Sequence, residues 1–97
     1  MKEVRFHPRV PGEVRKIISY YEEIAPELAE DFWLELNEAI RSAQVNPERH
    51  HFDPSGRRRG NLKRFPYHFL FRVFSDHIRI TIVRHDRRNP SLGNKRQ

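Results

Sequence analysis

The chain has 97 residues, 19 of them Lys or Arg and 13 Asp or Glu, with a formal net charge of +6 and a sequence pI near 10.3. This length fits one domain with a single core, and seven Phe, three Tyr and one Trp exclude a disordered chain. The absence of cysteine excludes disulfides and thiolate metal sites, and with no long apolar run or apolar leader we expect a soluble, cytoplasmic protein with no membrane span.

Charge divides the chain into two unequal parts. Residues 1–56 contain seven Lys or Arg and eleven acids, whereas residues 57–97 contain twelve Lys or Arg and only two acids, Asp76 and Asp86. An anionic partner, either nucleic acid or an acidic protein, is therefore expected to bind the second part.

The N-terminal half predicts a short strand and two helices. Alternation over residues 3–7 indicates the strand, which Pro8 and Pro11-Gly12 end. A first helix follows from apolar residues at helical spacing, namely Val14, Ile17, Ile18 and Tyr21. Pro26 begins a second helix with a broad apolar stripe of Leu28, Ala29, Phe32, Trp33, Leu36, Ala39, Ile40 and Ala43. The short connection predicts an antiparallel helix hairpin.

The C-terminal half predicts a loop, three strands and a tail. Residues 48–60 are interpreted as an irregular loop, and residues 61–65 as a short strand stopped by Pro66. Residues 67–74 carry apolar side chains on both faces, which is typical of a central strand. After a tight turn at residues 75–77, Ile78, Ile80 and Ile82 alternate with Arg79, Thr81 and Val83 in a hairpin partner. We expect residues 89–97 to form a basic tail that can be flexible.

The element order is β-αα-βββ, an α+β domain over residues 1–97. We expect the helix hairpin to cover one face of a small, twisted, antiparallel sheet. The first strand can pair at an edge or in the middle. The other face of the sheet is expected to be exposed and rich in arginine, so that it can bind the anionic partner.

Four stretches together resemble the ParE/RelE superfamily of toxins from type II toxin–antitoxin systems, with the ParE branch nearer. They are residues 4–8, the helix segments 18–22 and 28–32, the run Arg58-Arg59-Gly60-Asn61-Leu62-Lys63-Arg64-Phe65-Pro66-Tyr67, and the run Val83-Arg84-His85-Asp86-Arg87-Arg88-Asn89-Pro90. The resemblance covers roughly positions 4–92. It implies the same fold, and a toxin that halts growth of its own cell, as in plasmid stabilization.

The resemblance implies a cognate antitoxin as partner, in a hetero-oligomer, with DNA gyrase as the target in the ParE branch and the ribosome with its mRNA in the RelE branch. RelE-like endoribonucleases use an arginine on a central strand, an arginine near the terminal strand and, in many members, a C-terminal tyrosine. In this sequence those positions fall on His68, near Asp86 and near Leu92, which are other residue types, so the gyrase interpretation is preferred. A basic nucleic-acid-binding module without a toxin role remains the third alternative.

Candidate site residues come from the basic second part. Those expected to bind the target are Arg58, Arg59, Arg64, Arg84, His85, Arg87 and Arg88. If the chain cleaves RNA, His68 or His85 is the candidate acid or base, and Arg64, Arg87 and Arg88 are the candidates that supply positive charge at the phosphate. For Asp86, a structural role in which it pairs with a neighbouring arginine is as well supported as a chemical role. No cofactor is expected, and the six histidines lack the spacing of a metal site.

Overall fold

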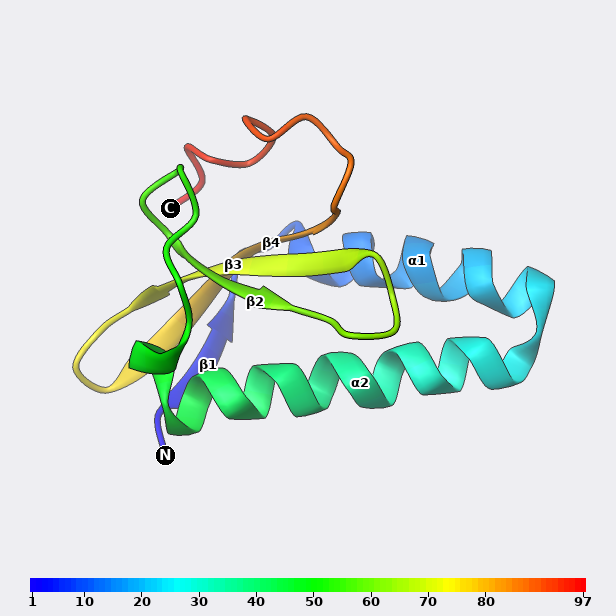
Figure 1. The fold of residues 1–97 in the computed structure, drawn as a ribbon, viewed down its shortest axis with the longest axis horizontal. Helices are drawn as coiled ribbons and strands as arrows, with labels where there is room; N and C mark the ends of the chain where they lie inside the picture. The colour runs from blue at the N-terminus through cyan, green and yellow to red at the C-terminus, as the bar shows by residue number, and fades with distance from the viewer.

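A computed structural model describes residues 1–97 and confirms the α+β order β-αα-βββ (Figure 1). The elements are β1 (Glu3–Phe6), α1 (Val10–Ile24), α2 (Pro26–Val45), the 3-10 turn η1 (Pro47–Arg49), β2 (Arg58–Asn61), β3 (Tyr67–Val73) and β4 (His77–His85). No helix combines the length and the apolar character that crossing a membrane requires.

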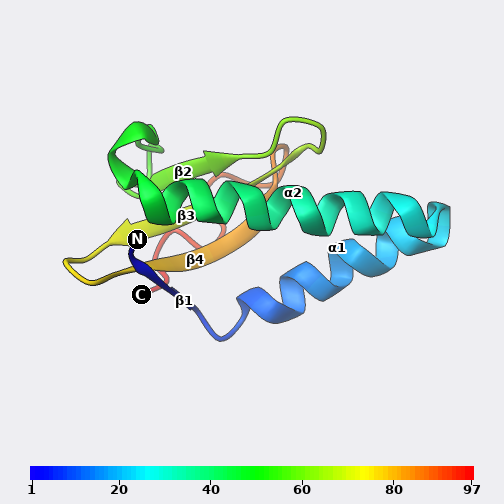
Figure 2. The same ribbon diagram turned by 90° about the horizontal axis from the view of Figure 1, so that it is seen from below.

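The two helices form the expected antiparallel hairpin, and they lie side by side in both views (Figures 1 and 2). Ala25 breaks the helical run because its backbone is extended, with φ −164° and ψ 131°. Pro26 then opens α2, where its missing N–H leaves no helical hydrogen bond unmade. Pro11 and Gly12 lie in the first turn of α1, so the strand ends before them.

The sheet is mixed, with the strand order β1-β4-β3-β2. Strands β2, β3 and β4 are antiparallel, and β3 is central as predicted. The expectation of an all-antiparallel sheet is wrong for β1, which lies at the edge and runs parallel to β4. A parallel pair needs a long crossover connection, and here the helix hairpin begins that connection immediately after β1.

The second strand is displaced from its predicted position. It covers Arg58–Asn61 rather than residues 61–65, and residue 58 also forms a bridge with Phe52. Residues 62–66 lie outside any strand and bend, and the Glu35 carboxylate on α2 accepts the backbone N–H groups of Lys63 (2.9 Å) and Arg64 (3.1 Å) there. The interpretation of residues 48–60 as an irregular loop is therefore wrong at both ends, where η1 and β2 form.

The helices cover one face of the sheet and enclose the core (Figure 2). Phe32 of α2 is fully buried, with its ring centroid 5.8 Å from that of Tyr21, 5.5 Å from Phe65 and 5.6 Å from Tyr67. The α2 stripe is thus confirmed as the main apolar face. Trp33, the next residue, lies at its margin and is 48% exposed.

A bulge changes which face the end of β4 presents. Leu70 pairs with Ile82 and Phe71 with Ile80, so Thr81 is the extra residue. Alternation alone places Ile82 with Ile78 and Ile80, but after the bulge it is Val83 that joins the core beneath the helices. Ile82 is buried on the opposite face, where the backbone of Gly93 approaches so closely that a Cβ there would overlap the Ile82 side chain.

The face of the sheet opposite α2 is not exposed, contrary to expectation. Residues 86–97 fold back across it, as the orange and red segment of Figure 1 shows. The Arg84 Nη1 group donates to the carbonyl oxygens of Pro90 (3.1 Å) and Leu92 (2.6 Å), and Arg72 and Arg79 bond Gln97. The molecule therefore has three layers: helices, sheet and the C-terminal segment.

Candidate functional site

Arg84 and His68, two of the residues singled out in the sequence, are buried between the sheet and the C-terminal segment. Arg84 is 4% exposed and His68 is 1% exposed. The Arg84 Nε–H donates to His68 Nε2 at 2.9 Å, so that nitrogen must carry a lone pair. The proton of the neutral ring is therefore on Nδ1, which donates to the Asp86 carboxylate at 2.8 Å.

This arrangement leaves His68 without a free nitrogen. Burial lowers the pKa of the His68 imidazole, and the guanidinium groups of Arg59 and Arg84 lower it further, against the opposing effect of Asp86. A neutral ring with both nitrogens bonded to the protein orients its neighbours and is not placed to exchange a proton with a substrate.

Asp53 completes a polar cluster, which we define as Asp53, Arg59, His68, Arg84 and Asp86. The Asp53 carboxylate is 3.4 Å from Arg59 Nη1 and 3.7 Å from Arg84 Nη2, and the expected pairing of Asp86 is found, at 3.5 Å from Arg59 Nη2. Burial alone would raise the pKa of Asp53, but hydrogen bonds from Ser55 and Arg59 outweigh it and hold the pKa below its usual value. Two carboxylates thus balance two guanidinium groups, with Asp53 and Arg84 buried and Arg59 and Asp86 partly exposed.

Other predicted target-binding residues are scattered over the surface. Arg64 lies in the turn before β3 and pairs with Asp31 on α2 at 3.4 Å. The Arg58 guanidinium donates to the His50 carbonyl at 2.8 Å and lies 4.2 Å from the centroid of the Phe52 ring. The predicted residues therefore do not converge on one site.

The predicted patch at the end of β4 is exposed. Arg87 and Arg88 follow the last strand residue, His85, in a turn, and both are exposed. His85 Nδ1 accepts the Arg87 backbone N–H at 3.0 Å, and its ring packs edge-on against Tyr67 with centroids 5.0 Å apart. His85 and Arg88 also line a larger feature.

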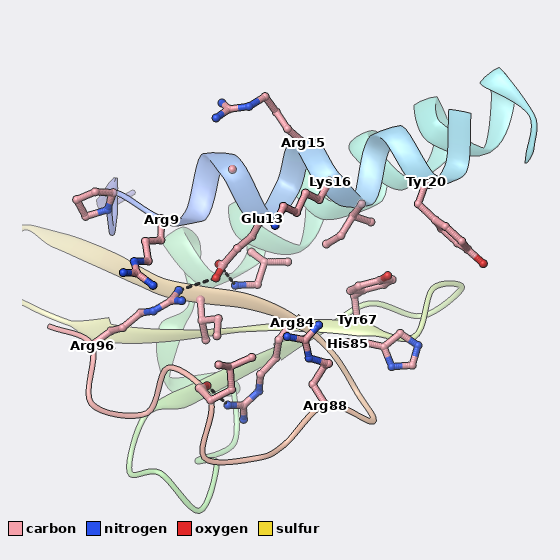
Figure 3. Close-up of a pocket in the computed structure, with 16 residues that line it drawn as sticks. Arg9, Glu13, Arg15, Lys16, Tyr20, Tyr67, Arg84, His85, Arg88 and Arg96 are labelled. Carbon is pink, nitrogen blue, oxygen red and sulfur yellow. Dashed lines mark hydrogen bonds and ion pairs between the residues drawn. The ribbon is translucent and has the colours of Figure 1, made fainter. Parts of the chain in front are cut away.

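That feature is a groove between α1 and the end of β4, with a volume of about 740 Å³ (Figure 3). We call it the basic groove. It is lined by Pro8, Arg9, Gly12, Glu13, Arg15, Lys16, Ile17, Tyr20, Tyr67, Ile82, Val83, Arg84, His85, Arg88, Leu92 and Arg96. It forms because β1 pairs with β4 only as far as Ile80, so the later residues of β4 face α1 with no strand between them.

The electrostatics of the basic groove are one-sided. Glu13 is its only acid, and this carboxylate is already engaged by Arg96 Nη1 at 2.7 Å and by the Val83 backbone N–H at 3.1 Å. Arg9, Lys16 and Arg88 are exposed and take part in no ion pair. The groove consequently presents uncompensated positive charge.

Sequence reasoning missed the α1 side of this groove. Glu13, Lys16 and Tyr20 follow one another at intervals of three and four residues, along the flank of the apolar stripe formed by Val14 and Ile17. That spacing was available in the sequence. What it did not reveal is that the end of β4 lies opposite this flank.

Comparison with known proteins agrees with the fold. Residues 4–90 match the family model of the ParE toxin of type II toxin–antitoxin system, parDE. A solved structure described as a chromosomal ParDE TA system from P. aeruginosa has a TM-score of 0.74 and 22% sequence identity, covering 88% of this chain and 96% of the other. A search of curated proteins finds no match. Because the family model spans most of the sequence, this chain belongs to the family of ParE toxins of type II toxin–antitoxin systems.

Proposed function

We propose that this ParE-family toxin arrests growth by inhibiting DNA gyrase in the cytoplasm, and that a cognate antitoxin neutralises it. The observation that carries the proposal is the family match over residues 4–90. On this proposal the protein acts by binding and performs no chemistry of its own.

The charge of the chain supports a protein partner of opposite character. With a net charge of +6, the toxin attracts an antitoxin segment rich in acidic and apolar residues, which folds as it binds. The name of the similar P. aeruginosa structure, a ParDE TA system, supports a toxin and antitoxin that act as a pair.

We assign the contact with the target to the end of β4 and the exposed turn that follows it, at His85, Arg87 and Arg88. These side chains lie at the rim of the core and can contact a partner without disturbing the fold. Arg84 is a poor candidate for this contact because its guanidinium is occupied by the C-terminal segment.

The polar cluster favours the gyrase target over cleavage of ribosome-bound mRNA. A nuclease needs a group to activate the 2′-hydroxyl and another to protonate the leaving oxygen. His68 has both nitrogens bonded, whereas His85 has only Nδ1 bonded to the backbone. Of the two candidate histidines only His85 can therefore take one of these roles, and the two cannot act together as an acid–base pair.

Two assays test the proposal. Induced expression should halt growth, and co-expression of a cognate antitoxin should restore it. The purified toxin should inhibit supercoiling by gyrase or trap cleaved DNA, while leaving mRNA intact in a translation reaction. Cleaved message with unimpaired gyrase would replace this function with the endoribonuclease.

Paired variants locate the contact surface. Replacing both Arg87 and Arg88 with alanine should weaken gyrase inhibition while leaving the thermal unfolding curve unchanged. The matched control replaces Arg41 and Arg49, two exposed arginines on α2 and η1, and removes the same charge. If the control loses as much inhibition as the Arg87 and Arg88 variant, net charge alone explains the effect and the assigned surface is wrong.

A further inference from the structure

We propose that the basic groove binds single-stranded nucleic acid, with phosphates along Arg9, Lys16 and Arg88 and a base at the Tyr20 and Tyr67 end. This gives the toxin a nucleic-acid contact of its own, which does not depend on the identity of its protein target.

The first observation is the distribution of committed and uncommitted cations. Several arginines are held by carboxylates: Arg5 by Glu3, Arg59 by Asp53, Arg64 by Asp31 and Arg96 by Glu13. Arg9, Lys16 and Arg88 have no such partner, yet they line the same groove from α1 and from the turn after β4. Cations kept close together without counter-charges favour a polyanion that follows the groove.

The second observation concerns Glu13, the one acid in the groove. Its carboxylate would repel a phosphate, but Arg96 reaches across from the C-terminal segment and pairs with it at 2.7 Å, as Figure 3 shows. The Arg96 guanidinium also donates to the Thr81 carbonyl at 3.1 Å, which fixes its position at the edge of β4. The repulsive charge is therefore neutralised within the molecule.

The third observation is a group of aromatic rings at one end of the groove. In Figure 3, Tyr20 extends from α1 at the same end of the groove as Tyr67 and His85, and it is 58% exposed. An exposed ring beside free cations is the combination that holds unpaired bases and their phosphates in single-strand-binding proteins. Bases in a duplex are stacked on one another and cannot use it.

The apolar lining distinguishes this occupant from an acidic peptide. An acidic segment of a protein would use the same cations, but it would also need aliphatic surface for its own apolar side chains. Ile17, Ile82 and Val83 are at most 7% exposed, and Leu92 is the one large aliphatic side chain of the lining that is exposed, at 36%. The Tyr20 ring is more exposed, at 58%, which favours bases.

The test is fluorescence anisotropy of the purified full chain with a short labelled oligothymidylate, with the same oligonucleotide annealed to its complement, and with a labelled polyglutamate peptide. The proposal expects the single strand to bind most tightly of the three. Neutralising Lys16 and Arg88 with glutamine should weaken binding about tenfold or more, and should lower the slope of log affinity against log salt by about 1 for each residue.

Two controls separate the groove from general charge. Glutamine at Arg41 and Arg49 removes the same charge from exposed positions on α2 and η1, and should change single-strand affinity much less. Tyr20→Ala should lower single-strand affinity about tenfold, whereas Trp33→Ala, which removes a half-exposed ring on α2, should not.

Three outcomes would overturn the proposal. The first is an equal loss of affinity in the groove variant and in its charge control. The second is duplex binding as tight as single-strand binding, with no effect of Tyr20→Ala. The third is tighter binding of polyglutamate than of the single strand, which would assign the groove to an acidic protein. Gyrase inhibition is measured separately on the same preparations, so failure of nucleic-acid binding leaves the proposed toxin function standing.

Discussion

Replacing Arg84 with methionine should destabilise the fold strongly, because Arg84 links the sheet to the C-terminal segment. Methionine has a similar length but no charge. Its introduction leaves His68 Nε2, the Pro90 and Leu92 carbonyl oxygens and the Asn94 side chain without their donor. It also leaves buried Asp53 with one fewer cation nearby.

The expected magnitude is about 3–5 kcal/mol, the usual loss when one partner is removed from a buried charged network. Separate hydrogen bonds to a charged group are worth about 1.5–3 kcal/mol each, but they are not additive within one network. Since a domain of this size is typically stable by about 5–15 kcal/mol, the variant should lose a large part of its free energy of unfolding.

Urea denaturation followed by circular dichroism measures this loss, and hydrogen exchange reports on residues 90–94. Exchange there should become fast in the variant. Arg87→Met is the matched control, because Arg87 is exposed and unpaired, and it should change stability by less than about 0.5 kcal/mol. A loss below about 1 kcal/mol for Arg84→Met, or unchanged exchange in the C-terminal segment, would show that Arg84 does not hold that segment.

Three further predictions concern the core and pH. Phe32→Ala should cost about 3–5 kcal/mol in urea denaturation because the ring is fully buried, whereas Trp33→Ala, at a half-exposed neighbour, should cost much less; equal losses would contradict the assigned core. Gly60→Ala should destabilise the chain, since the new Cβ would overlap the Phe69 ring, and an unchanged unfolding midpoint would refute this contact. Burial lowers the pKa of His68, so below about pH 6.5 the unfolded chain binds more protons than the folded chain. The free energy of unfolding should therefore fall as the pH decreases toward the folded-state pKa. His68→Gln should reduce this dependence, and an unaltered pH profile would contradict it.

The elements that depend on local patterns could be predicted from the sequence. The apolar stripe of α2 follows helical spacing, and Pro26 marks its start. The two-sided apolar character of residues 67–74 identified the central strand. In contrast, the parallel pairing of β1 and the Thr81 bulge depend on partners distant in the chain, which alternation within one strand cannot reveal.

The site was less predictable for the same reason. Arg84 and Arg88 are the same residue type in one basic run, but one is buried beneath the C-terminal segment and the other is exposed. The difference arises from the return of that segment across the sheet. Likewise, Lys16 and Tyr20 line the groove because β1 ends at Phe6. The later part of β4 therefore faces α1 with no strand between them.

The pairing of β1 with β4 also constrains when the protein can become complete. Residue 3 pairs with residue 77, so β1 cannot form its hydrogen bonds until β4 has been synthesised. Contacts between such distant segments form late and slowly. The ribosome must therefore release the residues of β4 before the sheet can close, and until then β1 and the helices that follow it have no completed sheet to pack on.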